Sequence, residues 1–321
     1  MFKYVLKRIG LLLMTFLIIM VICFVMIKSL PLTPPEGINE SQVAVIKARW
    51  EALGYYQPVM VQLWRYFVNI ITKWDWGTSW YIDYNLPAIQ SLTNRIGPTM
   101  LINTYSLIFS VPLGIVLGIF AALKKNKWQD NVISVLIMVF VSVPSYVYAF
   151  LVQYFFCFKV QIWPLTASSL SDAGGSYFSW TMFHSLVPAV LSLSFGTIAG
   201  LARFVRAELT ESLTSEYMLL ARAKGLTNTQ ATVRHALNNA MVPILPSILA
   251  DFIDIIGGSL VIEQIFSVPG VGYLFIKAIN MKDYDVYMVC NGFYVFIGLA
   301  ASILIDLSYG FIDPRIRMGE K

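Results

Sequence analysis

Residues 208–243 read ELTESLTSEYMLLARAKGLTNTQATVRHALNNAMVP, a polar helical segment between long apolar segments. Working outward from it, the chain contains six apolar runs of about the length that a bilayer core requires. The runs are residues 9–27, 99–123, 132–158, 184–201, 244–266 and 286–309. This pattern predicts an all-α membrane protein with six transmembrane helices. Segment 208–243 is then the place where the protein meets something soluble.

Composition excludes a soluble globule, because 57% of the 321 residues are hydrophobic, only 13% are charged, and the mean hydropathy is +0.68. The net charge of +5 is spread over short clusters, which argues against nucleic-acid binding. Cys23, Cys157 and Cys290 sit within apolar runs without metal-ligand spacing, so we interpret them as small hydrophobes. Residues 9–27 exceed a signal-peptide core and lack a cleavage site, which favours a retained first span.

Basic residues predict the orientation. They gather in the N-terminus, in residues 124–127, around segment 208–243 and in the tail 313–321. The positive-inside rule then places both termini and segment 208–243 in the cytoplasm. The expected domains are residues 1–30, the N-terminus and first helix; 31–97, an extracellular aromatic-rich loop domain; 98–312, a core of five helices with a cytoplasmic loop at 205–243; and 313–321, the tail. The aromatic residues of 31–97 suit interfacial anchoring, with a stacking site for sugar or peptide as the alternative.

Two glycine pairs at four-residue spacing, Gly114 with Gly118 and Gly196 with Gly200, predict close packing of helix backbones. The chain has no GxxxxGK[ST] phosphate loop, so we predict that it binds no nucleotide and is not an enzyme. His184 and His235 are isolated and favour structural roles. A membrane enzyme would require a convergent catalytic set. A secondary transporter would require an inverted repeat, which the single polar segment interrupts.

The first half of segment 208–243 predicts a helix with one apolar stripe. The stripe is Leu209, Leu213, Tyr217 and Leu220. Lys224 in the last turn and Gly225 beyond it predict the end of this helix. The bend is lined by small residues, Ala221, Ala223 and Gly225. Such a bend suits docking into a groove of another protein, or equally an amphipathic hairpin on the cytoplasmic leaflet.

The second half predicts another helix. Thr227 with Gln230 three residues later predicts a capping box at its start, and Pro243 predicts its end. The expected apolar face is Val233, Ala236, Leu237 and Ala240.

Residues 221–243, ARAKGLTNTQATVRHALNNAMVP, resemble the cytoplasmic coupling loop of membrane subunits of ATP-binding-cassette (ABC) importers, in the form found in oligopeptide and dipeptide permeases. The general importer pattern, EAA-x3-G-x9-I-x-L-P, is matched only at Ala221, Gly225 and Leu237. Glu216 lies three residues before the position of that pattern's glutamate. Residues 53–54, 74–79, 263–272 and 306–317 also resemble this family, so the resemblance covers nearly the whole chain.

The resemblance implies a type I ABC importer permease fold in a bacterial plasma membrane. It implies a homologous second permease subunit, two cytoplasmic ATPase subunits that bind ATP and Mg, an extracellular substrate-binding protein and a peptide substrate, with no cofactor in this chain. Nickel chelates or another small solute are the alternative cargo. The expected ATPase-coupling residues are Glu216, Tyr217, Leu220, Ala221, Arg222, Ala223, Lys224, Gly225, Leu226 and His235.

Two acids fall within the fifth apolar run. Asp251 and Asp254 are spaced i and i+3 on one face of a helix. A carboxylate exposed to lipid there costs several kcal/mol, so both are expected to face a cavity or a partner. They are candidates for the translocation pathway, where a carboxylate attracts a peptide's ammonium group. The alternative is that they hydrogen-bond neighbouring helices or line a hydrated surface without touching substrate. Glu263, nearer the outer end, is interpreted as structural.

Overall fold

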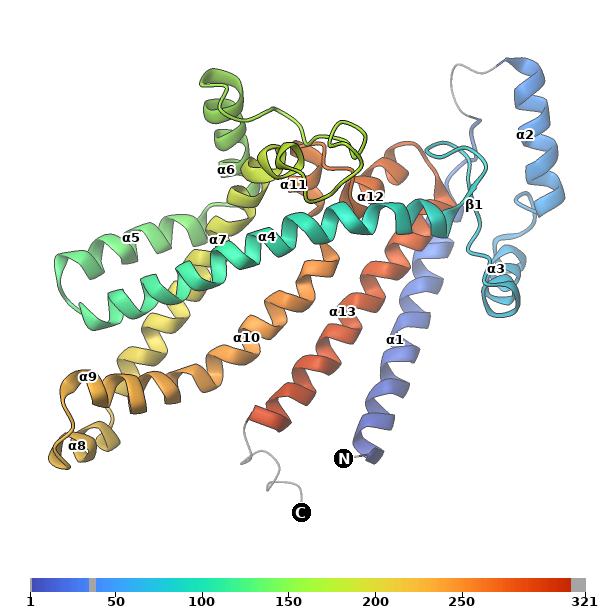
Figure 1. Cartoon of the computed structure of the whole chain (residues 1–321). Coiled ribbons are helices and arrows are strands. Elements are labelled where there is room, and N and C mark those ends of the chain that lie inside the picture. The colour runs from blue at the N-terminus through green and yellow to red at the C-terminus, as the bar shows by residue number, and fades with distance from the viewer. Residues whose placement is uncertain (1, 35–38, 313–321) are drawn as a thin grey trace. The chain divides into compact units, whose positions relative to one another are not determined.

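The computed structural model describes residues 2–34 and 39–312, and their side chains except at 2–6, 253–257 and 304–312. The described fold is almost entirely helical, with one two-stranded antiparallel sheet that pairs Thr78 with Pro87 and Ser79 with Leu86. In chain order the elements are α1 (Phe2–Lys28), α2 (Glu40–Leu53), α3 (Val59–Lys73), β1 (Thr78–Ser79), β2 (Leu86–Pro87), α4 (Ala88–Leu123), α5 (Trp128–Ser142), α6 (Ser145–Val152), the π-helix η1 (Gln153–Lys159), α7 (Trp180–Leu213), α8 (Glu216–Ala223), α9 (Asn228–Ala231), the π-helix η2 (Thr232–Ala236), α10 (Leu237–Gly257), α11 (Leu260–Ile265), α12 (Val271–Asn280) and α13 (Tyr284–Ile312) (Figure 1).

Four described helices are long and apolar enough to cross a membrane, and a fifth span results if α5 and the α6–η1 segment count as one. The four are residues 7–28 of α1, α4, α7 and residues 284–303 of α13. They contain the predicted runs 9–27, 99–123 and 184–201 and most of the run 286–309. The chain is therefore a multi-pass membrane protein.

The predicted run 132–158 does not form one continuous helix. It bends by 100° between Ser142 and Ser145. Pro144 has extended backbone (φ −57°, ψ 141°), and Val143 before it is also extended. A residue before proline is driven out of the helical region by the proline ring, which accounts for the break.

The predicted run 244–266 is also interrupted, because α10 ends at Gly257 and α11 begins at Leu260. Gly258 has φ 67° and ψ −177°, a conformation accessible in practice only to glycine. A Cβ atom at this position would lie 2.5 Å from Glu263 Oε1 and 2.6 Å from Thr99 Cγ2. Backbone conformation and close packing both require glycine at this break.

The chain divides into two compact units. Unit 1 comprises residues 1–97 and 269–300, and unit 2 comprises residues 98–268 and 301–321. In unit 1, Met20, Phe24, Tyr66 and Met288 form one buried cluster between α1, α3 and α13. A second cluster packs α12 against the start of α4 and α13, and a third surrounds the buried indole of Trp50.

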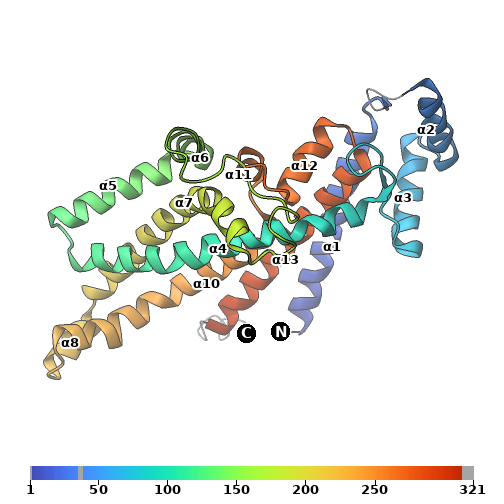
Figure 2. The same cartoon turned by 45° about the horizontal axis from the view of Figure 1, so that its top comes forward.

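Unit 2 is built around α7. In Figures 1 and 2, α7 and α10 run side by side, and α5 and α6 also contact α7. Asp130 of α5 is almost fully buried and accepts two hydrogen bonds from Arg206 of α7, at 2.6 and 2.8 Å. This bidentate pair fixes the register between the two helices.

The pair Gly114 and Gly118 brings α4 against α7, as predicted. A Cβ atom at Gly118 would lie 2.6 Å from Val205 Cβ and 2.7 Å from the Ala202 carbonyl oxygen. The second pair differs from the prediction. A Cβ atom at Gly196 would lie 3.0 Å from the Tyr148 hydroxyl oxygen, but a Cβ at Gly200 meets no described atom within 4 Å. Four-residue spacing places both members of a pair near one helix face, and only a partner helix on that face makes it a packing site.

Replacing Gly118 with alanine should destabilise the purified protein by about 1–3 kcal/mol, because backbone and Cβ atoms of α7 have to move apart. Gly200→Ala is the matched control: it lies on α7 with open space and should raise stability by up to about 1 kcal/mol through helix propensity. Thermal unfolding in detergent measures both. Equal unfolding temperatures for the two variants would contradict the close approach of α4 and α7.

Candidate functional site

The first half of the polar segment 208–243 was predicted to form one continuous helix. In the structure it is divided between two helices. Helix α7 ends at Leu213 and α8 begins at Glu216. The Ser215 hydroxyl donates to the Ser212 carbonyl at 2.6 Å, and the Thr214 hydroxyl bonds carbonyls of the last turn of α7. Hydroxyl side chains that bond the local backbone compete with helix continuation, which explains the break.

Because of this break, the predicted apolar stripe divides between two surfaces. Leu209 is fully buried, whereas Tyr217 and Leu220 are 37% and 58% exposed. The face of α8 that packs inward carries Met218 and Ala221, which join a cluster with α7 and α10. The expectation that Tyr217 and Leu220 continue the stripe of Leu209 is wrong, since the chain changes direction at residues 214–215.

The turn at Gly225 is as predicted. Gly225 has φ +85°, and its N–H donates to the Arg222 carbonyl at 2.9 Å. Thr227 and Gln230 form the predicted capping box: the Thr227 N–H donates to Gln230 Oε1 at 3.1 Å, and the Gln230 N–H donates to Thr227 Oγ1 at 3.3 Å. Helix, glycine turn and helix are therefore determined by local sequence.

The second helix does not end at Pro243. Elements α9, η2 and α10 follow one another without a break to Gly257, with Pro243 and Pro246 inside α10. Interior prolines each cost about 3 kcal/mol in an isolated helix. Here the inward face is buried, including Ala240, Ile244 and Ile248, and this packing offsets the cost. Of the predicted apolar face, Val233 is 58% exposed, whereas Ala236 and Ala240 are buried.

Most predicted coupling residues form one exposed surface around α8 and the turn, which we call the α8 surface. It consists of Glu216, Tyr217, Leu219, Leu220, Arg222, Ala223, Lys224 and Gly225. Leu226 is half-buried beside it, and Ala221 is buried beneath it. His235 is exposed on η2, an element that contacts α8. In Figure 1, α8 and α9 lie next to each other, near the end of α7 and the start of α10.

Leu219 was not among the predicted coupling residues, yet it is 66% exposed and is the most exposed leucine of the α8 surface. Its exposure follows from the structure: because Met218 and Ala221, spaced i and i+3, share the inward face, Leu219 and Leu220 face outward. Two adjacent exposed leucines beside charged residues are typical of a protein contact. The surface thus combines an apolar centre with a charged rim.

Asp251 lies on α10 and lines a cavity of about 190 Å³ in unit 2. The other polar side chains of the lining are Asn103 and Ser106 of α4, Thr197 of α7, and Ser259 beyond the Gly258 break. Asp251 was expected to face a cavity or a partner, and it lines a cavity. The side chain of Asp254 lies outside the described residues. Glu263 is fully buried and accepts a hydrogen bond from the Thr99 hydroxyl at 2.9 Å, consistent with its predicted structural role.

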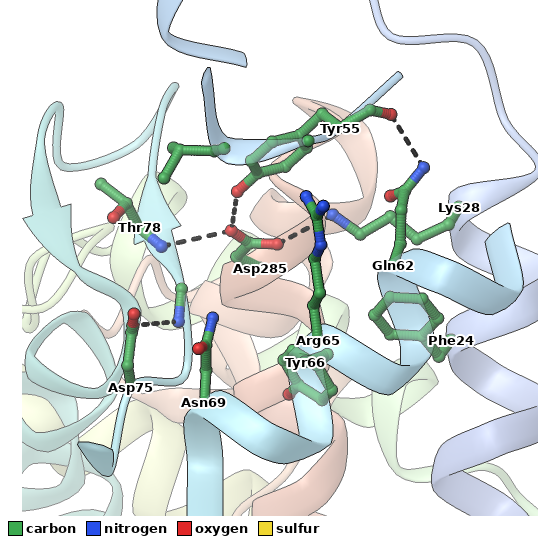
Figure 3. Close-up of a pocket in the computed structure, with 13 residues that line it drawn as sticks. Phe24, Lys28, Tyr55, Gln62, Arg65, Tyr66, Asn69, Asp75, Thr78 and Asp285 are labelled. Carbon is green, nitrogen blue, oxygen red and sulfur yellow. Dashed lines mark hydrogen bonds and ion pairs between the residues drawn. The ribbon is translucent and has the colours of Figure 1, made fainter. Parts of the chain in front are cut away.

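Unit 1 contains a second pocket, of about 100 Å³, that was not predicted (Figure 3). At its wall the Lys28 ammonium pairs with Asp285 at 3.0 Å, and both side chains are 5% exposed. Asp285 also accepts from the Tyr55 hydroxyl and from the Thr78 N–H. Burial, followed by the charge of Asp285, raises the pKa of Tyr55 well above its usual value, so this hydroxyl remains a donor.

The same region explains two sequence elements. Gly77 has φ +93°, and a Cβ there would lie 2.4 Å from Asp285 Oδ2. Asp283 is fully buried and accepts from the Ser79 hydroxyl at 2.6 Å and from the N–H groups of Tyr81 and Ile82, each at 3.1 Å. Burial raises the pKa of Asp283. Residues 74–82 are thus held around two carboxylates that precede or begin α13.

The chain is similar to known membrane transport proteins over nearly its full length. Residues 114–318 match the family model described as binding-protein-dependent transport system inner membrane component. The dipeptide transport system permease protein DppB of Lactococcus lactis is 33% identical over 320 residues, covering 99% of this chain and all of the relative. DppB of Bacillus subtilis is 32% identical over 325 residues, covering both chains completely. The glutathione transport system permease protein GsiC of Salmonella paratyphi A is 32% identical over 319 residues, 99% of each chain.

The family match covers more than half of the chain, and the relatives align over nearly its full length. This chain belongs to the family of binding-protein-dependent transport system inner membrane components.

Proposed function

We propose that this chain is a transmembrane permease subunit of an ATP-driven importer for peptides and forms half of its translocation pathway. The full-length similarity to permeases named for dipeptide and glutathione transport supports this function. Glutathione is itself a short peptide derivative, so both groups of relatives point to small peptidic cargo. The other half of the pathway comes from a homologous second permease subunit.

The proposed topology has six spans in a bacterial plasma membrane. The fifth span is α10 with α11, and the third is the bent α5, α6 and η1. Both termini and the α8 surface are cytoplasmic, and residues 31–97 are external, where a substrate-binding protein delivers the peptide. The distribution of basic residues supports this orientation.

The α8 surface is the proposed docking site for a cytoplasmic ATPase subunit, one on each permease. The observation that carries this assignment is the exposure of Tyr217, Leu219 and Leu220 beside the open backbone at Gly225. Large apolar side chains surrounded by charged residues are suited to fill a groove on a protein partner. Glu216, Arg222, Lys224 and His235 supply the polar rim, and Leu226 and the buried Ala221 support it.

The mechanism follows from the attachment of this surface to α7 and α10. Met218 and Ala221 pack into the same cluster as Val205, Ala240 and Ile244, so a displacement of α8 moves both long helices as a body. ATP and Mg bind to the ATPase subunits, whose closure drives rigid-body alternating access in the permease pair. This chain supplies the pathway and the coupling, and needs no cofactor of its own.

Affinity purification of this chain from its native membrane should recover two ATPase chains and a second permease. In proteoliposomes with the substrate-binding protein, the complex should take up a labelled dipeptide only with ATP. A complex whose ATPase cannot hydrolyse ATP is the matched control and should show no uptake. Uptake driven by an ion gradient without ATP would instead identify a secondary transporter and contradict the proposal.

A further inference from the structure

The cavity around Asp251 is suited to one kind of chemical group. Its volume of about 190 Å³ is below the range of about 300–1,000 Å³ typical of sites that enclose a whole drug-sized ligand. A cavity of this size can enclose a single chemical group but not a whole peptide. The lining comes from α4, α7 and α10, three helices of unit 2 that carry the proposed pathway.

Asn103 and Ser106 each keep a lone pair that can accept a hydrogen bond from a ligand. Asn103 donates from Nδ2 to the Thr99 carbonyl at 2.8 Å, which leaves its side-chain carbonyl to accept. Ser194 donates to the Val190 carbonyl at 2.7 Å, so in the Ser106–Ser194 contact at 3.0 Å the proton comes from Ser106. The Ser106 oxygen then keeps a lone pair for an incoming donor.

The charged side chain in the described lining of the cavity is an aspartate. Asp251 supplies a carboxylate, and none of the lining residues that the structure describes is Lys, Arg or His. A half-buried carboxylate with carbonyl and hydroxyl acceptors favours a compact cation with several N–H donors. An ammonium group has three such donors and fits this arrangement.

We propose that the Asp251 cavity binds the α-ammonium group of a peptide during its passage through the permease. This inference rests on the proposed function, because it takes a peptide as the cargo and α10 as part of the pathway. Asp251 forms the ion pair, and Asn103 and Ser106 accept the remaining N–H groups. The cavity thus recognises a feature common to all peptides with a free amino terminus, independent of their side chains.

The first experiment measures binding to the purified importer in nanodiscs by saturation-transfer NMR. The probes are alaninamide, which carries a free ammonium group, and N-acetylalaninamide, which does not. Wild type should bind alaninamide only. Asp251→Asn should weaken this binding about tenfold, and Ser106→Ala by a smaller factor, as expected for the loss of one charge-assisted and one neutral hydrogen bond. Ser192→Ala is the matched control, because Ser192 is buried on α7 outside the cavity and bonds only the Pro188 carbonyl in the described structure.

Equal binding of alaninamide to wild type, Asp251→Asn and Ser106→Ala would overturn the proposal, as would equal binding of both probes to wild type. The second experiment is ATP-dependent uptake of a dipeptide at saturating binding protein. Asp251→Asn should lower its rate about tenfold while ATP hydrolysis continues. A wild-type complex that hydrolyses ATP but imports no peptide would refute the peptide function, and the NMR result would still decide what the cavity binds.

Discussion

Replacing Ala223 with leucine should slow coupled transport about 30-fold while leaving the fold intact. Ala223 is exposed at the end of α8, between Arg222 and Lys224. Leucine is a good helix former, so the helix itself tolerates the change. The added side chain enlarges the surface that is proposed to enter an ATPase groove, where a loss of about 2 kcal/mol corresponds to about a 30-fold decrease in uptake rate. Uptake of a labelled dipeptide into proteoliposomes measures the effect.

The matched control is Ala207→Leu, which places the same side chain at an exposed position of α7 outside the α8 surface. Its uptake should remain near that of wild type. A bulky residue at Gly225 should also uncouple transport from ATP hydrolysis, but this substitution tests docking less directly. Although a Cβ there meets no described atom within 4 Å, the φ of +85° adds about 1–2 kcal/mol of backbone strain. Normal uptake by Ala223→Leu would show that the docking assignment is wrong.

Replacing Lys28 with methionine should destabilise unit 1 by about 3–5 kcal/mol, because it leaves the buried carboxylate of Asp285 without a cation. The ammonium of Lys28 also lies 4.2 Å from the ring centre of Tyr55, so the substitution removes a cation–π contact. Thermal unfolding in detergent should report a large decrease in midpoint temperature. Addition of Asp285→Asn should recover part of the loss by removing the unpaired charge.

Arg95→Met is the control for this prediction. Arg95 also pairs with an aspartate, Asp83, at 2.7 Å, but the two side chains are 20% and 25% exposed. Water compensates such a pair more readily, so its loss should cost only about 1 kcal/mol. If Lys28→Met and Arg95→Met unfolded at the same temperature, burial of the Lys28–Asp285 pair would not contribute as argued.

Local signals predicted the parts of the coupling region that depend on near neighbours. Gly225 was expected to end a helix because its φ is unfavourable for other residues, and Thr227 with Gln230 was expected to cap the next helix. Both depend on groups within three residues of one another. The direction of α8 was not predictable in this way, because Tyr217 and Leu220 have the spacing of a stripe with Leu209. Instead, the side-chain hydroxyls of Thr214 and Ser215 bond backbone carbonyls and break the helix, so Tyr217 and Leu220 face outward.

Whether a proline ends a helix also could not be predicted from neighbouring residues alone. Pro144 ends a helix and Pro243 does not, although both stand in apolar surroundings. The difference lies in packing: Ala240, Ile244 and Ile248 bury one face of α10 continuously across Pro243, which offsets the lost hydrogen bond. The residues adjacent to either proline in the sequence do not indicate whether this packing is present.

The sequence alone determined that this chain is a helical membrane protein with a polar, glycine-bent segment, because hydrophobic run length and capping chemistry act over a few residues. It also contained the family resemblance that the comparisons then showed. Only the tertiary structure decided which groups meet: Lys28 with Asp285, 257 residues apart, Asp251 with Asn103 and Ser106 around one cavity, and Gly118 against α7. The physical reason is that these contacts depend on how helices pack, and many packings satisfy the same local pattern of apolar and polar residues.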